Sequence, residues 1–157
     1  MLPKSGDLGN AGNWRPIAIL PILYKIFSRM IYHRLQPTLD RHQSHDQFGF
    51  RPACRIDDAV VVLENVIGKS IEFNTPLWIA CIDLRKAFDR IQYGPLFQAL
   101  REQGIPNPYV AFMSELYRDQ WGYVRGGSYF QIQRGVKQGD VISPMLFTAR
   151  LKTAIQS

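Results

Sequence analysis

The sequence has little of several features that would direct it to particular classes of protein. It holds two cysteines, Cys54 and Cys81, far apart in 157 residues. Cys81 lies in an apolar run and is interpreted as a small core residue rather than half of a disulfide. No apolar run approaches the ~18–20 residues that span a bilayer, and the N-terminal segment has no apolar signal-peptide core. We therefore expect an intracellular protein without a membrane partner, in either the nucleus or the cytoplasm.

Metal-binding and acidic side chains are also sparse. The three histidines, His33, His42 and His45, share no zinc-finger spacing with a cysteine or a further ligand. Thirteen Asp and Glu stand against 19 Lys and Arg, which gives a formal net charge of +6. This excess favours a polyanionic partner such as nucleic acid or nucleotide phosphates. Charge alone does not decide the matter, because many basic proteins bind no nucleic acid.

The spacing of apolar and turn residues predicts an α+β protein with one domain, since 157 residues are enough for one core. The expected helices run from Pro21 to a stop at Pro37, then over about 56–67, 95–103 and 108–118, and finally from Ser143–Pro144, with serine as N-cap, to the chain end. A strand is expected over 77–82, and a hairpin joins Tyr123–Val124 to Phe130–Ile132 through Gly126–Ser128.

The stretch CIDLRKAFDRI, residues 81–91, places Asp83 at the end of the expected strand. A strand end presents a side chain rigidly, which suits a catalytic group. Arg85, Lys86 and Arg90 follow it and favour its ionised form, and such a carboxylate suits a hard cation such as Mg²⁺. The alternative is an aspartate that ends a strand and caps a turn, the commoner case for one aspartate taken alone.

Two further segments carry residue types suited to a nucleotide. In RGVKQGDVISPMLF, Gly135 and Gly139 allow a close backbone approach, and Gln138 offers an amide ahead of a helix N-terminus. In NWRPI, Arg15 follows a glycine-rich loop that carries Lys4, and both side chains suit a phosphate. The alternatives are a plain loop-to-helix junction and an ordinary surface pair of basic residues.

Together these segments resemble the reverse transcriptase domain, most closely that of non-LTR (LINE-type) retrotransposons and more distantly that of group II introns. Five blocks occur in the order of that family: PKSG…NWRPI, LPILYKIFSRMIYHRL, DQFGFRP, CIDLRKAFDRIQ and RGVKQGDVISPMLF. The resemblance spans nearly the whole chain. It implies a partial right-hand polymerase fold, with fingers over about 1–76, an incomplete palm over 77–157, and antiparallel palm strands packed on helices.

The resemblance also implies roles for individual residues. Asp83, with the backbone carbonyl of Leu84, would hold catalytic Mg²⁺ or Mn²⁺, a cofactor expected only in the complete domain. Phe88 would be the steric gate that clashes with a ribonucleotide 2′-hydroxyl, the group that separates the two sugars. The remaining nucleotide-binding residues would be Lys4, Arg15, Gln138 and Gly139, and the template-contacting residues would be Phe48, Gly49, Phe50 and Arg51. Asp89 is expected to be structural, paired with Arg85 or Arg90.

The implied reaction is RNA-directed DNA synthesis. The 3′-hydroxyl of a DNA or RNA primer, paired with an RNA template, attacks the α-phosphate of a deoxynucleoside triphosphate. The family's later aromatic-x-Asp-Asp element is absent up to Ser157, and neither Asp57–Asp58 nor Asp140 is interpreted as its substitute. We therefore expect a domain fragment that is inactive alone. The alternative is a non-catalytic nucleic-acid-binding remnant of a retroelement, and the pattern leaves the oligomeric state open.

Overall fold

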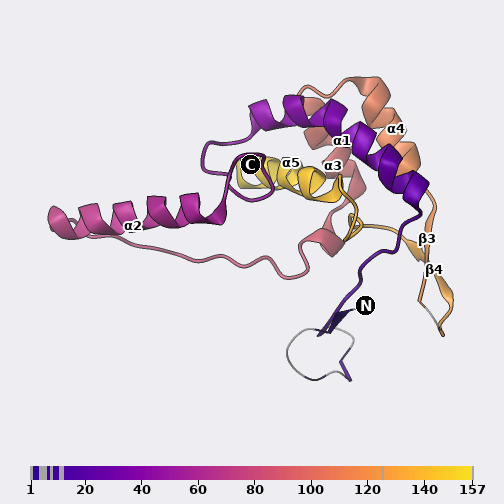
Figure 1. Cartoon of the computed structure of the whole chain (residues 1–157), viewed down its shortest axis with the longest axis horizontal. Coiled ribbons are helices and arrows are strands. Elements are labelled where there is room, and N and C mark those ends of the chain that lie inside the picture. The colour runs from indigo at the N-terminus through magenta and orange to yellow at the C-terminus, as the bar shows by residue number, and fades with distance from the viewer. Residues whose placement is uncertain (1, 4–6, 8, 11–12, 125, 157) are drawn as a thin grey trace.

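The computed structural model describes residues 2–3, 7, 9–10, 13–124 and 126–156 (Figure 1). Its helices are α1 (Ile22–His42), α2 (Ile56–Glu72), the short 3₁₀ helix η2 (Phe88–Arg90), α3 (Tyr93–Glu102), α4 (Asn107–Tyr117) and α5 (Ser143–Gln156). Its strands are β1 (Leu2–Pro3), β2 (Trp14–Arg15), β3 (Gln120–Tyr123) and β4 (Tyr129–Ile132). They form two antiparallel two-stranded sheets, β1–β2 and β3–β4. The mixture of helices with small antiparallel sheets confirms the α+β class.

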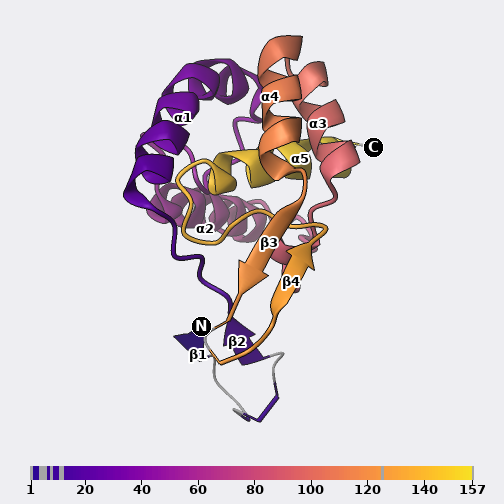
Figure 2. The same cartoon turned by 90° about the vertical axis from the view of Figure 1, so that its right-hand side faces the viewer.

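The core lies where α5 packs against α3 and α1, with α4 beside α3 (Figure 2). Leu146 and Ala149 of α5, and Leu96 and Leu100 of α3, are fully buried there. In each helix these residues are three or four positions apart, so they form one apolar stripe on a 3.6-residue turn. Both helices fold because their stripes bury each other.

Helix α1 continues beyond Pro37, so the expected stop at this residue was wrong. A proline inside a helix lacks a backbone donor and clashes with the preceding turn. Leu35 and Leu39, on either side of it, are both almost completely buried, and this burial outweighs the local cost. At the far end, Lys152 of α5 donates a hydrogen bond to the backbone carbonyl of His42, the last residue of the helix.

Two helices expose apolar side chains. On α1 the row of Ile22, Ile26 and Met30 faces solvent, and the buried face is Ser28, Ile31, Leu35 and Leu39. Helix α2 continues past its expected end at about residue 67, and none of its residues is buried. It projects away from the other helices (Figure 1). Among the described helices, none is long and apolar enough to cross a membrane.

The segment from 75 to 84 is extended but forms no strand, so the strand expected over 77–82 was wrong. A strand needs a neighbouring backbone to satisfy its N–H and C=O groups, and none of the described segments pairs with it. Trp78 is 94% exposed. Cys81 is exposed as well, so its expected place in the core was also wrong.

The C-terminal half agrees more closely with the sequence pattern. Helices α3 and α4 and the hairpin β3–β4 lie within a few residues of their expected bounds. Gly104 ends α3 with a φ of +77°, which glycine adopts without a steric penalty. Helix α5 begins at Ser143 itself, one residue earlier than an N-cap serine would place it.

Candidate active site

The turn between β4 and α5, residues 135–142, is attached by its backbone to two distant segments. The amides of Gly135 and Val136 donate to the carbonyls of Ile91 and Phe88, at 2.8 and 2.9 Å. The carbonyl of Gln138 accepts from the amide of Ala18, at 2.8 Å, in the segment that follows β2. Three of the sequence blocks, NWRPI, AFDRI and RGVKQGD, therefore meet around one turn.

Glycine is needed twice where these segments meet. Gly135 has a φ of +92° and Gly139 a φ of +101°, in the region that L side chains avoid. A Cβ on Gly135 would lie 3.0 Å from the Cα and the carbonyl oxygen of Asp89, and one on Gly139 would lie 3.2 Å from the carbonyl oxygen of Ala18. At both glycines the neighbour that approaches is another stretch of this chain's backbone, and the close approach to a ligand stays a prediction.

Gln138 is also linked to this meeting point through its side chain. Its Nε2 donates a hydrogen bond to Oδ1 of Asp89, at 2.8 Å. Asp89 was expected to pair with Arg85 or Arg90. That expectation was wrong, because the turn places the Gln138 amide against the Asp89 carboxylate instead. The bond is charge-assisted and fixes the direction of the Gln138 side chain.

Phe88, the expected sugar gate, lies in an aromatic group formed by three segments. Its ring stacks on that of Phe147 of α5, with centroids 4.9 Å apart and planes 15° apart. Phe50, from the loop between α1 and α2, meets the Phe88 ring edge-on at 5.8 Å. Such aromatic pairs are geometrically specific, so Phe147 and Phe50 hold the Phe88 ring in place.

Asp83 and Leu84 lie at the exposed end of the extended segment and line a cleft of about 330 Å³ against α5. The rim also carries three arginines, Arg85, Arg90 and Arg150. The Asp83 carboxylate and the Leu84 carbonyl are oxygen donors of the kind that Mg²⁺ and Mn²⁺ prefer. Within the described residues, however, no three acidic, His or Cys side chains gather to hold an ion, so the donors fit in kind but not in number.

A buried polar cluster beneath the turn was not identified from the sequence. Asp140 is 3% exposed. Its carboxylate accepts hydrogen bonds from the hydroxyls of Ser28, on Oδ1, and Tyr24, on Oδ2 at 3.0 Å. Lys137 places its Nζ 3.2 Å from the Tyr24 hydroxyl and over that ring. The available signal was Ser28 itself, a polar residue in the buried stripe of α1.

This cluster is electrostatically unusual. Burial raises the pKa of the Tyr24 phenol above its ordinary value, and the neighbouring Asp140 carboxylate raises it further. Burial lowers the pKa of Lys137, which the same carboxylate partly opposes. Asp140 is thus shared between two hydroxyls and a nearby cation, as a buried carboxylate requires. Its contacts anchor the turn that leads into α5 to α1.

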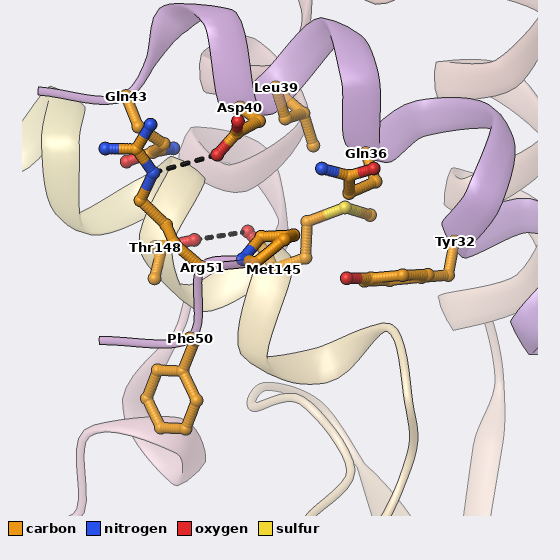
Figure 3. Close-up of a pocket in the computed structure, with 10 residues that line it drawn as sticks. Tyr32, Gln36, Leu39, Asp40, Gln43, Phe50, Arg51, Met145 and Thr148 are labelled. Carbon is orange, nitrogen blue, oxygen red and sulfur yellow. Dashed lines mark hydrogen bonds and ion pairs between the residues drawn. The ribbon is translucent and has the colours of Figure 1, made fainter. Parts of the chain in front are cut away.

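The loop with the expected template residues is held against α1 and α5 (Figure 3). Arg51 pairs with Asp40 through Nε and Oδ1 at 2.8 Å, and its Nη1 donates to the carbonyl of Ser44. The hydrogen bond to Asp40 raises the pKa of Arg51 above its ordinary value. Figure 3 shows this pair beside a small pocket of about 20 Å³ that Phe50 and Met145 also line. Arg51 therefore positions the loop through internal contacts.

The other expected residues are less closely grouped. Arg15 lies on β2, opposite Leu2 of β1, and is exposed. Lys4 lies outside the described residues. Phe48 is half-buried and Gly49 exposed in the loop that Arg51 anchors. The structure thus brings together Phe88, Gln138 and Gly139, places Phe50 beside them, and leaves Asp83 in the adjoining cleft.

Comparison with known proteins gives one family. Over residues 2–157 the chain matches the model described as "Reverse transcriptase (RNA-dependent DNA polymerase)". It is 33% identical, over 96% of its length, to the Retrovirus-related Pol polyprotein from type-1 retrotransposable element R2 of Popillia japonica, of which it covers 22%. It is 27% identical, over 93% of its length, to the corresponding polyprotein of element R2DM of Drosophila melanogaster, of which it covers 14%.

A further relative comes from another element. The chain is 30% identical, over 86% of its length, to the Probable RNA-directed DNA polymerase from transposon X-element of Drosophila melanogaster, of which it covers 15%. The chain thus spans about a fifth or less of the length of these curated relatives.

Proposed function

This chain belongs to the reverse transcriptase family, as a domain similar to those of non-LTR retrotransposon polyproteins, and we propose that it supplies the incoming-nucleotide site of RNA-directed DNA synthesis. The observation that carries the proposal is the hydrogen bond from Gln138 to Asp89. It joins the QGD turn to the residue that directly follows Phe88. Phe88 and Gln138, two of the side chains expected to contact the nucleotide, are therefore positioned by one set of contacts.

Phe88 selects the sugar in this proposal. Its ring is braced by Phe147 and Phe50, so it cannot turn aside when a ribose 2′-hydroxyl meets it. Rejection by a ring held in a packed group is stronger than rejection by a mobile one, since displacing it would break the aromatic contacts. A deoxynucleotide lacks the hydroxyl and fits over the same ring.

Gln138 and Gly139 line the sugar and base pair on the opposite side. The Gln138 side chain is fixed by Asp89, and the bare backbone of Gly139 lets the nucleotide approach closely. Arg15 and Lys4 hold the triphosphate, Arg15 by its planar guanidinium and Lys4 as a point charge. Positioning by prearranged groups is the main contribution that a protein makes to phosphoryl transfer.

Asp83 and the Leu84 carbonyl are proposed as part of a divalent-metal site. A bound Mg²⁺ or Mn²⁺ would neutralise charge on the phosphates, and these two oxygens would supply only part of its coordination. The loop of Phe48, Gly49, Phe50 and Arg51 faces the RNA template, with the primer beyond it. In this proposal residues 1–76 correspond to fingers and 77–157 to part of the palm.

The proposal is tested by calorimetric titration of the 157-residue chain with dATP and with ATP, in Mg²⁺. These nucleotides differ only in the 2′-hydroxyl. We expect dATP to bind more tightly, Phe88→Ala to remove that difference, and Gln138→Ala to weaken both. Phe73→Ala, an exposed phenylalanine at the end of α2, is the control and should change nothing. Equal affinity of the unaltered chain for both nucleotides would overturn the proposal.

A further inference from the structure

The hairpin β3–β4 has two unlike faces. Its register pairs Trp121 with Gln131 and Tyr123 with Tyr129. Directly paired residues point to the same face of an antiparallel ribbon, and alternate residues share it as well. Trp121, Tyr123, Tyr129 and Gln131 therefore form one surface, which we call the aromatic face.

The aromatic face is turned to solvent. The side chains are 63% exposed at Trp121, 55% at Tyr123 and 72% at Tyr129. The two tyrosine rings lie side by side, with centroids 5.0 Å apart. Three large rings on four-residue strands leave an unusual amount of aromatic surface in water, since such rings usually bury most of their area.

The opposite face carries a single aromatic ring, Phe130, which is 48% exposed. The Gln120 amide donates to the carbonyl of Leu116 at 2.8 Å, which attaches the ribbon to α4. The ring of Phe130 lies over Gly122, where a Cβ would stand 2.5 Å from it. The hairpin extends beyond the helices (Figure 2). Its register places the aromatic face along its length.

The charged residues of the hairpin and the turn that follows it are basic. Residues 120–136 hold two arginines, Arg125 and Arg134, and no acidic residue. At the base of the hairpin Glu115 pairs with Arg118 at 2.8 Å, and the exposed Asp119 carboxylate accepts a hydrogen bond from Gln131 at 3.4 Å. Together with the net charge of +6, this favours an anionic partner at the hairpin.

We propose that the aromatic face binds single-stranded nucleic acid by stacking bases on Trp121, Tyr123 and Tyr129. Exposed aromatic rings in a basic surface are the two elements of a single-strand binding site, because every base has a π face and every nucleotide has a phosphate. Along β3 the two rings are about 6.8 Å apart, two residue steps, which is about two steps of ~3.4 Å between stacked bases. A duplex, whose bases are already stacked, offers no such faces.

This surface is distinct from the nucleotide site. It uses none of Asp83, Phe88 or Gln138, so it does not rest on the proposed function. It is nevertheless close to that site in the chain, because β4 leads within three residues into Gly135 and the turn that carries Gln138. A strand held on the hairpin would therefore be held beside the turn that positions the nucleotide.

The test is a titration of the purified chain with 15-nucleotide oligo(U), oligo(dT) and a matched duplex, followed by fluorescence anisotropy. Both single strands should bind more tightly than the duplex. The double variant Trp121→Ala/Tyr129→Ala should lose about a hundredfold, since each stacked ring contributes about tenfold. Trp78→Ala is the matched control, because its ring is 94% exposed but lies outside the hairpin, and it should bind as the parent does.

Two further variants separate the possible reasons for failure. The alanine variant alone cannot separate the loss of base stacking from an unfolded hairpin. The variant Trp121→Phe/Tyr129→Phe keeps aromatic rings at both positions and should retain most of the binding. Gln138→Ala should leave strand binding intact even where it abolishes nucleotide binding. Unchanged binding by the alanine variant, an equal loss with Trp78→Ala, or equal affinity for the duplex would overturn the proposal. So would a dimer that the alanine variant dissociates, because the face would then belong to a second copy.

Discussion

At the scale of single residues, the best-defined feature is how closely backbone segments approach around Gly135 and Gly139. The donors and acceptors that join the QGD turn to Phe88, Ile91 and Ala18 are main-chain atoms. Side chains at the two glycines would separate these atoms. The position of Gln138, and with it the proposed nucleotide site, therefore depends on residues that contribute no side chain.

Gly135→Ala is expected to destabilise the fold. The substitution forces an alanine to a φ of +92° and places its Cβ 3.0 Å from the Asp89 backbone. A cost of about 1–3 kcal/mol in the free energy of unfolding is the usual range for such backbone strain. Urea denaturation measures it. Gly68→Ala, in α2 with nothing within 4 Å of its Cβ, is the control and should be neutral or stabilising. Equal effects of the two substitutions would contradict the account.

Tyr24→Phe should change how stability depends on alkaline pH. The folded chain keeps the Tyr24 phenol protonated, because burial and Asp140 raise its pKa. The unfolded chain ionises the same phenol from about pH 10. Above that pH the folded state binds more protons, so the free energy of unfolding falls as pH rises. Without the phenol, this part of the fall disappears.

Denaturant midpoints between pH 8 and pH 11 give the slope. The variant also loses one hydrogen bond to Asp140, which lowers its stability at every pH, so only the slope is diagnostic. Lys137 acts with the opposite sign, since its pKa is lowered and its stability contribution rises with pH, and it is present in both proteins. Tyr123→Phe, at an exposed tyrosine, should keep the parent slope. Identical slopes for Tyr24→Phe and the parent would count against the buried cluster.

At the scale of elements, α2 stands apart because none of its residues is buried. The hydrogen bond from the Arg55 amide to Asp58 caps its first turn, and Asp57 and Asp58 favour the positive end of the helix dipole. A helix of 17 residues held mainly by such local terms is marginally stable in water. Local order in α2 therefore depends on its own sequence far more than on the core.

Hydrogen exchange should separate α2 from the core helices. Amides of α2 are expected to exchange much faster than those of α3 and α5, which bury each other's apolar stripes. Mass-spectrometric exchange of the intact chain, followed by peptide mapping, provides the comparison. Protection of α2 equal to that of α3 would mean that its apolar side is covered in solution, contrary to the exposure described above.

The sequence predicted local elements better than their partners. Helices α3 and α4 and the hairpin follow from periodicity and turn residues close to them in the chain. Pro37 was misjudged because the burial of Leu39 depends on α5, more than a hundred residues later. The strand over 77–82 was misjudged because a run of apolar residues cannot reveal whether another backbone lies beside it.

The site shows the same division. The resemblance named Phe88, Gln138 and Gly139 as nucleotide-binding residues, which stays a prediction, and the structure shows that the blocks that carry them meet. The contacts that position them were not predictable, because Asp89 and Gln138 are 49 positions apart, and Tyr24 and Asp140 are 116 apart. Tertiary packing decides which donor reaches which carboxylate, and the spacing of residues in the sequence does not reveal that packing.

At the scale of the whole molecule, two separate surfaces are proposed to contact nucleic acid. The net charge is +6, and the aromatic face and the Phe48–Arg51 loop belong to different elements. Binding of a strand should therefore weaken as salt rises, because each neutralised phosphate releases counterions. Binding of one nucleotide, which has few charges and lies among packed side chains, should depend less on salt.

The most direct test of the central claim is photo-crosslinking of the chain with 8-azido-dATP in Mg²⁺, followed by peptide mapping. We predict label in the segments 86–91 and 135–139, removed by an excess of unlabelled dATP and reduced by Gln138→Ala. Label confined to α2 or to the β3–β4 hairpin, or label that dATP does not displace, would contradict the assignment of the nucleotide site to the turn that joins Phe88 and Gln138.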